Sequence, residues 1–228
     1  MIKFNNIMNS SLQPHLIITG MHRSGTSYLS RALNLSGVNL GPISQYYDTE
    51  ITPITGNAKG HWENVEVNHI NEEILKTNDC SWDHIPNTID KIPSNLSKRI
   101  NDVFDSFHKS KSVAYGFKDP RFCITLDKWI PFFDNPIIIG IFRNPLKVAE
   151  SLKIRNNFSY DKSLLLWEMY NTHLIKYLKK HNGFLINFDW EKNKLFKEIT
   201  LICQKLNLTK INLDYWFSTE LKQSDKSF

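Results

Sequence analysis

A short apolar segment that runs directly into a glycine-bounded, hydroxyl-rich turn is the feature that most constrains this fold. Leu16–Thr19 is apolar and β-branched, the turn extends from Gly20 to Gly25, and an amphipathic helical pattern continues through Leu33. Glycines let the backbone approach a ligand closely, and the N–H groups in the first turn of a helix attract anions. The segment therefore predicts a strand, a phosphate-binding loop and a helix in succession.

The loop differs at one position from the pattern G-x-x-x-x-G-K-[ST] of nucleotide hydrolases. Its two glycines have the required spacing, but Thr26 stands where that pattern has its lysine. Arg23 supplies a permanent positive charge and a planar fork of donors, which can perform part of the lysine's role. Ser24 and Ser27 add further hydroxyl donors. The loop is predicted to bind phosphate, but not ATP with magnesium.

Strand and helix patterns alternate over most of the chain, which is typical of a parallel sheet flanked by helices. Further strands are expected at Val113–Lys118, Pro136–Phe142 and Phe184–Phe188. Helices are expected at Ser27–Ser36, Val65–Thr77, Leu96–Lys109, Pro145–Arg155, Tyr160–His181 and Lys194–Leu206. The predicted fold class is α/β, with three layers (α/β/α) around a central parallel sheet and a P-loop-like phosphate-binding loop.

The length of 228 residues suits a single α/β domain with a core of its own. We expect residues 1–13, which are rich in Asn and Ser, to form a flexible N-terminal segment, and residues 14–228 to form that domain. The stretch Gly41–Gly60 shows no periodicity and is expected to be a surface loop, and loops of this length often act as lids.

Charge and composition limit the partners and the compartment. The net charge of +5 suits a protein that binds polyanionic small molecules, and the basic residues form no block typical of nucleic-acid binding. Three widely spaced cysteines predict neither a disulfide framework nor a metal site. Met1–Gln13 lacks the apolar stretch of a signal peptide, and the apolar run Pro136–Phe142 is too short to span a membrane. We therefore expect a cytoplasmic protein with no integral membrane segment and no nucleic-acid partner.

Cationic residues follow three predicted strands, at the point where each strand ends. The phosphate loop follows the first strand, Lys118–Arg121 follows the second, and Arg143–Pro145 follows the third. The carboxyl ends of parallel strands meet at one edge of a sheet, so these groups are expected to lie together. A helix that begins at Pro145 would carry Ser151 within reach of the phosphate that Arg143 binds. The chain thus offers two anion-binding stations, which suits a ligand with two separated anionic ends.

These stations together resemble the sulfotransferase family, in particular its compact bacterial members. Sulfotransferases move a sulfuryl group from 3'-phosphoadenosine 5'-phosphosulfate (PAPS) to a hydroxyl or amine and release 3'-phosphoadenosine 5'-phosphate (PAP). The resemblance extends from Leu16 to about Leu208. It implies that the 5'-phosphosulfate is bound by His22, Arg23, Ser24, Gly25, Thr26 and Ser27.

The second family signature is an arginine, a proline two residues later and a serine eight residues after the arginine, and it binds the 3'-phosphate. Arg143, Pro145 and Ser151 have this spacing. Arg155, one helical turn after Ser151, is either a contact to the donor or the acceptor or a surface arginine. Phe188 stands where relatives often carry an aromatic residue near the adenine, and its alternative role is that of a buried core residue of its strand.

The resemblance further implies that Lys118 faces the transferring sulfuryl group, where it and Arg23 would neutralise developing charge. Members with a histidine base place it two residues after this lysine, but Pro120 occupies that position here. Members with an arginine in the first loop instead use a glutamate, and Gly60–Asn64 resembles the segment that carries it. No metal is implied.

Three residues are candidates for the general base. Glu63 is the first choice, because it would accept the proton of the acceptor hydroxyl as the oxygen attacks sulfur. His61 is the second, because its ordinary pKa suits proton transfer. Asp119 is the third, and its alternative role is to orient Lys118 and Arg121.

The sequence leaves three functions open. The leading one is PAPS-dependent transfer of a sulfuryl group to a carbohydrate or another small hydroxylated acceptor, in which the glycan preference rests on analogy with bacterial relatives. The second is a P-loop nucleotide kinase, which Thr26 disfavours because it replaces the phosphate-binding lysine. The third is a non-catalytic nucleotide- or glycan-binding protein of the same fold. The sequence predicts neither the acceptor nor the oligomeric state.

Overall fold

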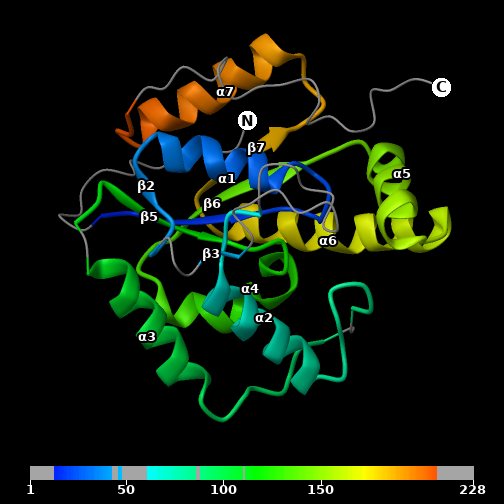
Figure 1. Ribbon diagram of the computed structural model, residues 1–228, viewed down its shortest axis with the longest axis horizontal. Coiled ribbons are helices and arrows are strands. Elements are labelled where there is room, and N and C mark those ends of the chain that lie inside the picture. Colours follow the sequence, from blue (N-terminus) through cyan, green and yellow to red (C-terminus); the bar gives the residue numbers. More distant parts are fainter. Residues whose placement is uncertain (1–12, 43–45, 48–60, 86–87, 110, 210–228) are drawn as a thin grey trace.

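Five short strands pair side by side into one parallel sheet, which forms the centre of the molecule (Figure 1). The computed structural model describes residues 13–42, 46–47, 61–85, 88–109 and 111–209. The spatial order of the strands is β2 (Val38–Asn39), β5 (Ala114–Lys118), β1 (His15–Thr19), β6 (Ile137–Phe142) and β7 (Gly183–Asn187). The first strand in the sequence of this sheet therefore lies at its centre, between β5 and β6.

Helices cover both faces of the sheet and give the fold three layers (Figure 1). One face is covered by α1 (Thr26–Leu35) and α7 (Lys192–Lys205). The other is covered by α2 (Val65–Thr77), α3 (Leu96–His108), α4 (Phe122–Trp129), α5 (Pro145–Asn156) and α6 (Tyr160–Lys180). A short 3₁₀ helix, Ile130–Phe132, continues α4, and a separate antiparallel pair is made by β3 (Tyr46–Tyr47) and β4 (Glu63–Asn64).

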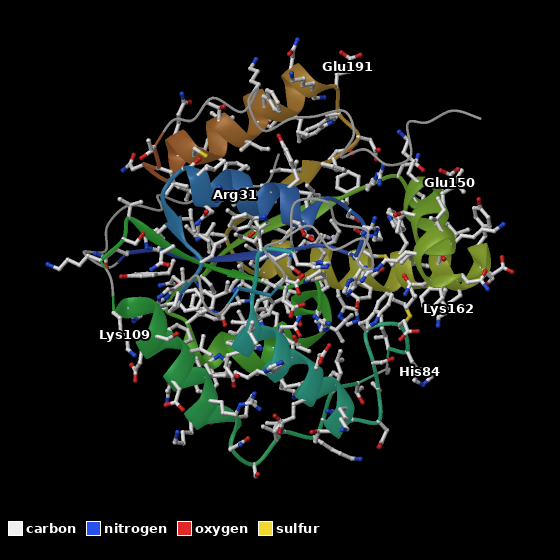
Figure 2. All side chains as sticks on the ribbon, viewed as in Figure 1. Arg31, His84, Lys109, Glu150, Lys162 and Glu191 are labelled. Atoms are coloured by element: carbon white, nitrogen blue, oxygen red, sulfur yellow. The ribbon has the colours of Figure 1, made fainter. Side chains whose placement is uncertain are left out.

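The alternation of side chains along β1 builds a hydrophobic core on each face of the sheet. Ile17 points into the core beneath α2 to α6, while Leu16 and Ile18 point into the core beneath α1 and α7. All three side chains are fully buried. Burial on both faces is typical of the central strand of a parallel sheet and explains the uninterrupted apolar run in the sequence. Figure 2 shows side chains filling the space between the sheet and each helix layer.

Local capping chemistry sets where three helices begin. Asn64 accepts hydrogen bonds from the backbone N–H groups of Glu66 and Val67 at the start of α2. Asn144 caps α5 in the same way, and Pro145 follows it at the first helical position. Ser159 caps α6. Helix α1 differs, because Gly25 precedes it and no side chain caps its first N–H groups.

The predicted fold class is confirmed, and the predicted strands and helices all occur within two residues of their expected bounds. The helix at 122–129 was not predicted from the sequence. Six of the eight side chains of α4 are buried, so the segment lacks the one-sided apolar stripe that marks a surface helix. The strands β2, β3 and β4, which are only two residues long, were also not predicted.

Part of the expected loop Gly41–Gly60 and both chain ends lie outside the described residues. Within that loop, the expectation of irregular structure was wrong at Tyr46–Tyr47, because β3 pairs with β4 there. The three cysteines are unpaired, with Cys123 and Cys203 buried and Cys80 half-buried. In the described part of the chain, no helix has both the length and the apolar composition of a membrane span.

A histidine pair at the amino-terminal end of the sheet makes the stability of this fold sensitive to pH. The Nε2 atoms of His15 and His108 lie 3.1 Å apart, and the His15 ring packs among Phe104, Phe117 and Phe133. Burial, together with the nearby His108, lowers the pKa of His15 to about 4. His15 therefore resists a proton that its unfolded form accepts near pH 6.5.

We expect the melting temperature to fall as the pH is lowered from 6.5 towards 4, because the unfolded state binds the proton first. The change His15→Phe keeps a ring in the cluster and removes the titrating group, so it should make this fall shallower. Thermal melts from pH 7 to 4 measure the effect, with the exposed His69→Phe as the matched control. Equal slopes for wild type and His15→Phe would contradict the expectation.

Candidate active site

The loop between β1 and α1 has a backbone shaped by close approach to two other segments. A Cβ atom at Gly20 would lie 2.0 Å from the carbonyl oxygen of Ile141, and one at Gly25 would lie 2.5 Å from the Phe188 ring. Gly25 has a φ of 89°, and Arg23 has a φ of 68° although it is not glycine. The loop thus holds Arg23 in a left-handed conformation that costs about 1–2 kcal/mol.

The loop also presents backbone N–H groups and hydroxyl groups at the start of α1. The first N–H groups of α1 have no side-chain cap. Ser24 is fully buried, and its hydroxyl has no hydrogen-bond partner among the described residues. Thr26 is buried and Ser27 half-buried in the first turn of the helix. Uncapped N–H groups and hydroxyl donors at the start of a helix are typical of an anion-binding site.

Arginines from three segments gather beside this loop. The Arg23 side chain donates from Nε to the Ser151 hydroxyl at 2.8 Å, and the Arg143 side chain donates to the Arg23 carbonyl oxygen at 3.4 Å. Burial, together with the positive charges of Arg155 and Arg143, lowers the pKa of Arg23 to about 10. These three guanidinium groups and Ser151 are named here the arginine cluster.

The end of β6 and the capped start of α5 position the arginine cluster. Arg143 follows β6 and is buried, and its Nε lies 3.7 Å from a carboxylate oxygen of Asp189. Ser151 lies on α5 and is buried, whereas Arg155 is exposed one turn later. The Trp167 indole donates to the Arg143 carbonyl at 2.8 Å, which ties α6 to this strand end. The structure thus brings together the two predicted anion-binding stations.

Phe188 occupies the core rather than an open surface. It is buried, its N–H donates to the Phe142 carbonyl at 2.8 Å, and its ring centre lies 5.5 Å from the Arg143 guanidinium. Its ring lies directly beneath Gly25. Phe188 therefore supports the loop and the arginine cluster from below.

A second charged group, named here the lysine–glutamate pair, lies on the other side of the loop. Lys118 ends β5, and its Nζ donates to Glu63 Oε1 at 2.5 Å, to the His61 carbonyl oxygen at 2.8 Å and to the Ser27 hydroxyl at 3.3 Å. Lys118 and Glu63 are both buried. The structure thus places predicted site residues from three segments, 27, 61–63 and 118, in direct contact.

The Glu63 carboxylate is held at both oxygens. Lys118 donates to Oε1, and Asn68, from the second turn of α2, donates to Oε2 at 2.8 Å. Arg121 Nη1 lies 4.0 Å from Oε2. Burial by itself would raise the pKa of Glu63, but the charges of Lys118, Arg121 and His61 together lower it to about 2. Glu63 is therefore ionised across the physiological pH range.

The Asp119 carboxylate is engaged by Arg121. Both carboxylate oxygens lie 3.1 Å from Arg121 Nη1, and Oδ1 also accepts the Arg121 backbone N–H at 2.7 Å. Arg121 Nη2 donates to Glu72 at 2.9 Å. Burial raises the pKa of Asp119, although the charge of Arg121 opposes this. The arrangement suits a residue that orients Arg121.

His22 packs against aromatic side chains, while His61 contributes its backbone. The His22 ring centre lies 4.5 Å from that of Trp82 and 5.7 Å from that of Tyr170. Burial, with Arg121 nearby, holds the pKa of His22 well below its ordinary value. His22 is therefore neutral and fixes the position of the loop. The His61 side chain is half-buried next to Glu63.

The structure adds two residues to this region that were not predicted from the sequence. Asn68 anchors Glu63, and Tyr28, on the first turns of α1, has its ring centre 5.8 Å from that of Phe188. A signal for Asn68 exists, because a polar residue on the buried face of α2 interrupts its apolar pattern. Among the described residues, no three His, Cys, Asp or Glu side chains converge as a metal site.

Solved sulfotransferase domains share this fold. One is the sulfotransferase domain from the Synechococcus PCC 7002 olefin synthase, with a TM-score of 0.53 and 13% identity, covering 97% of this chain and 84% of that chain. Another is a sulfotransferase from Alicyclobacillus acidocaldarius, with a TM-score of 0.52 and 14% identity, covering 93% and 89%. A third, the sulfotransferase domain from the curacin biosynthetic pathway, has a TM-score of 0.48 and 16% identity, covering 96% and 80%.

Neither a protein-family model nor a curated protein matches the chain. At these identities the structural likeness establishes the fold. The resemblance to sulfotransferases that the sequence motifs indicated is confirmed at that level.

The contact between Gly25 and Phe188 predicts a strong response to one added methyl group. Gly25→Ala should lower the free energy of unfolding by more than the roughly 1–2 kcal/mol that a left-handed alanine costs, because its Cβ also meets the Phe188 ring. Gly37→Ala is the matched control, since its φ is 100° but its nearest neighbour lies 3.4 Å away. Urea denaturation of both variants tests this, and equal losses would contradict the supporting role of Phe188.

Proposed function

We propose that this protein is a sulfotransferase that moves a sulfuryl group from PAPS to a hydroxyl group of a carbohydrate or another small hydroxylated acceptor. The observation that carries the proposal is the arginine cluster, in which Arg23 of the phosphate loop bonds Ser151 beside Arg143. Repulsion between the buried Arg143 and the neighbouring Arg23 is costly, and a bound anion would offset it. A donor with two separated phosphate groups suits these two adjoining stations.

In this proposal, PAPS supplies the sulfuryl group and PAP is its product. Residues 22–27 and the uncapped start of α1 would hold the 5'-phosphosulfate end, with Arg23 as the principal charge. Arg143, Ser151 and Arg155 would hold the 3'-phosphate. Phe188 would act indirectly, by supporting the loop. Tyr28 offers an aromatic ring beside Phe188 for the adenine base of the donor.

Glu63 is our choice of general base, and Lys118 of charge-neutralising group. Both lie beside Ser27 of the loop, where the reacting atoms would meet. Asp119 is less suited to the base role, because Arg121 occupies its carboxylate. His61 remains the alternative base from its place beside Glu63. No residue of the proposed mechanism requires a metal ion, since arginine and lysine charges face the anionic groups.

The kinase alternative finds less support in the geometry. Lys118 donates to Ser27 of the loop, but Lys118 is engaged by Glu63, and Thr26 occupies the position of the P-loop lysine. The proposed sulfotransferase and a non-catalytic binding protein of the same fold would both bind PAP. Only turnover distinguishes them.

Calorimetric titration with PAP tests the donor site. We expect PAP to bind, and Arg143→Ala to weaken binding by about 10- to 100-fold, because it removes charge-assisted hydrogen bonds to phosphate. The matched control is Arg99→Ala, which removes an arginine that pairs with Glu66 and Glu73 away from the loop. Binding of ATP with magnesium in place of PAP would instead support the kinase.

Turnover of Glu63→Gln separates an enzyme from a binding protein. With PAPS and a panel of mono- and oligosaccharides, the change should lower sulfate transfer by about 100-fold or more, which is typical of the loss of a general base. PAP binding should persist in the same variant. Unchanged transfer would exclude Glu63 as the base and direct attention to His61.

A further inference from the structure

The three hydrogen-bond donors of Lys118 are all engaged within the protein. A lysine ammonium group has three N–H donors and no acceptor. The three acceptors are Glu63 Oε1, the His61 carbonyl and the Ser27 hydroxyl, and Lys118 is only 2% exposed. Any anion that takes a hydrogen bond from Lys118 must therefore weaken one of these contacts.

Lys118 physically connects the phosphate loop to Glu63. Ser27 lies in the first turn of α1, where the loop would receive an anion, and it makes the longest of the three contacts, at 3.3 Å. Glu63 makes the shortest contact and is the only charged acceptor of the three. An anion at the loop and the Glu63 carboxylate therefore compete for one ammonium group in a buried site, where charges are weakly screened.

We infer that Lys118 is a donor-operated gate on Glu63: binding of the donor draws the Lys118 ammonium towards the loop and releases Glu63 Oε1 for the proton of the acceptor hydroxyl. This inference rests on the proposed function and adds a regulation of that same site. No covalent step is involved, because only the hydrogen bond from Nζ to Oε1 is exchanged for one from Nζ to the donor.

The contacts of the other carboxylate oxygen allow this exchange without loss of position. Asn68 holds Oε2 at 2.8 Å, and Arg121 lies 4.0 Å from the same atom. Within the part of the chain that the structure describes, Asn68 donates to Glu63, and Arg121 donates to Asp119 and Glu72 rather than to the loop. Both residues can therefore keep Glu63 in place while Lys118 shifts. Asn68 is thus a positioning residue for Glu63.

The electrostatics of Glu63 agree with such a gate. While Lys118 is bound, the pKa of Glu63 is about 2, and a carboxylate this acidic is a poor proton acceptor. When the ammonium moves away, burial raises the pKa of Glu63, and Glu63 becomes a stronger base. The other titratable or charged groups around Glu63 act on both states: Arg121, His61, Asp119 and His22.

A double-mutant cycle on PAP affinity tests the competition. We expect Glu63→Gln to bind PAP about tenfold more tightly than wild type, because it removes the charged competitor for Lys118. Lys118→Met should weaken PAP binding, and adding Glu63→Gln to it should bring no gain. The matched control is Glu72→Gln, which removes a carboxylate of the same ion-pair group that contacts Arg121 but not Lys118.

The outcomes separate this inference from the proposed function. A gain that also appears in Glu72→Gln, or that persists without Lys118, would show a general charge effect and overturn the gate. PAP binding that Glu63→Gln leaves unchanged would overturn the gate and leave the donor site standing. Failure of the wild type to bind PAP would overturn both.

Proton uptake gives a second measurement that needs no change at Lys118. If PAP binding raises the pKa of Glu63, wild type should take up more protons on binding PAP near pH 5 than Glu63→Gln does. Calorimetry in two buffers with different ionisation enthalpies measures this difference, and the titration of the PAP phosphates cancels between the two proteins. Equal proton uptake in both would overturn the gate.

Discussion

The site depends on the position of β1 at the centre of a parallel sheet. Its pairing with β5 sets Ile18 opposite Lys118, and its pairing with β6 sets Thr19 opposite Gly140. This register brings the ends of three strands to one edge, so the phosphate loop lies between Lys118 and Arg143. A shift of one residue would turn the buried side chains of β1 to the wrong faces, so the packing of two cores fixes the geometry of the site.

The cations on the two sides of the loop differ in how fully carboxylates neutralise them. Lys118 and Arg121 face the carboxylates of Glu63, Asp119 and Glu72, so this side is locally compensated. In the arginine cluster, Asp189 lies 3.7 Å from Arg143, and burial together with the charges of Arg155 and Arg143 lowers the pKa of Arg23. Like charges that are held together without full compensation cost stability, and such costs are concentrated at binding sites.

Much of this arrangement could be predicted from sequence because it is local. The loop and the Arg143 to Ser151 spacing lie on a strand, a turn and a helix that are contiguous in the chain, so periodicity and turn residues indicate them directly. Two other features depend on tertiary contacts between α2, β4 and the end of β5: the hydrogen bond from Asn68 to Glu63 and the ion pair of Asp119 with Arg121. Helix α4 was not predicted because tertiary packing buries it on nearly all sides, which removes the amphipathic pattern from its sequence.

The contrast between the two sides also suggests why the donor would enter first in the proposed reaction. The excess of positive charge lies at the arginine cluster, and long-range attraction favours arrival of a polyanion there. An acceptor hydroxyl is neutral and gains nothing from that field. On the side of Lys118 and Arg121, the Glu63 carboxylate accepts hydrogen bonds from Lys118 and Asn68. An acceptor that arrives before the donor therefore meets a carboxylate whose two oxygens are already engaged. Charge distribution and hydrogen-bond occupancy thus favour the same order of binding, with the donor before the acceptor.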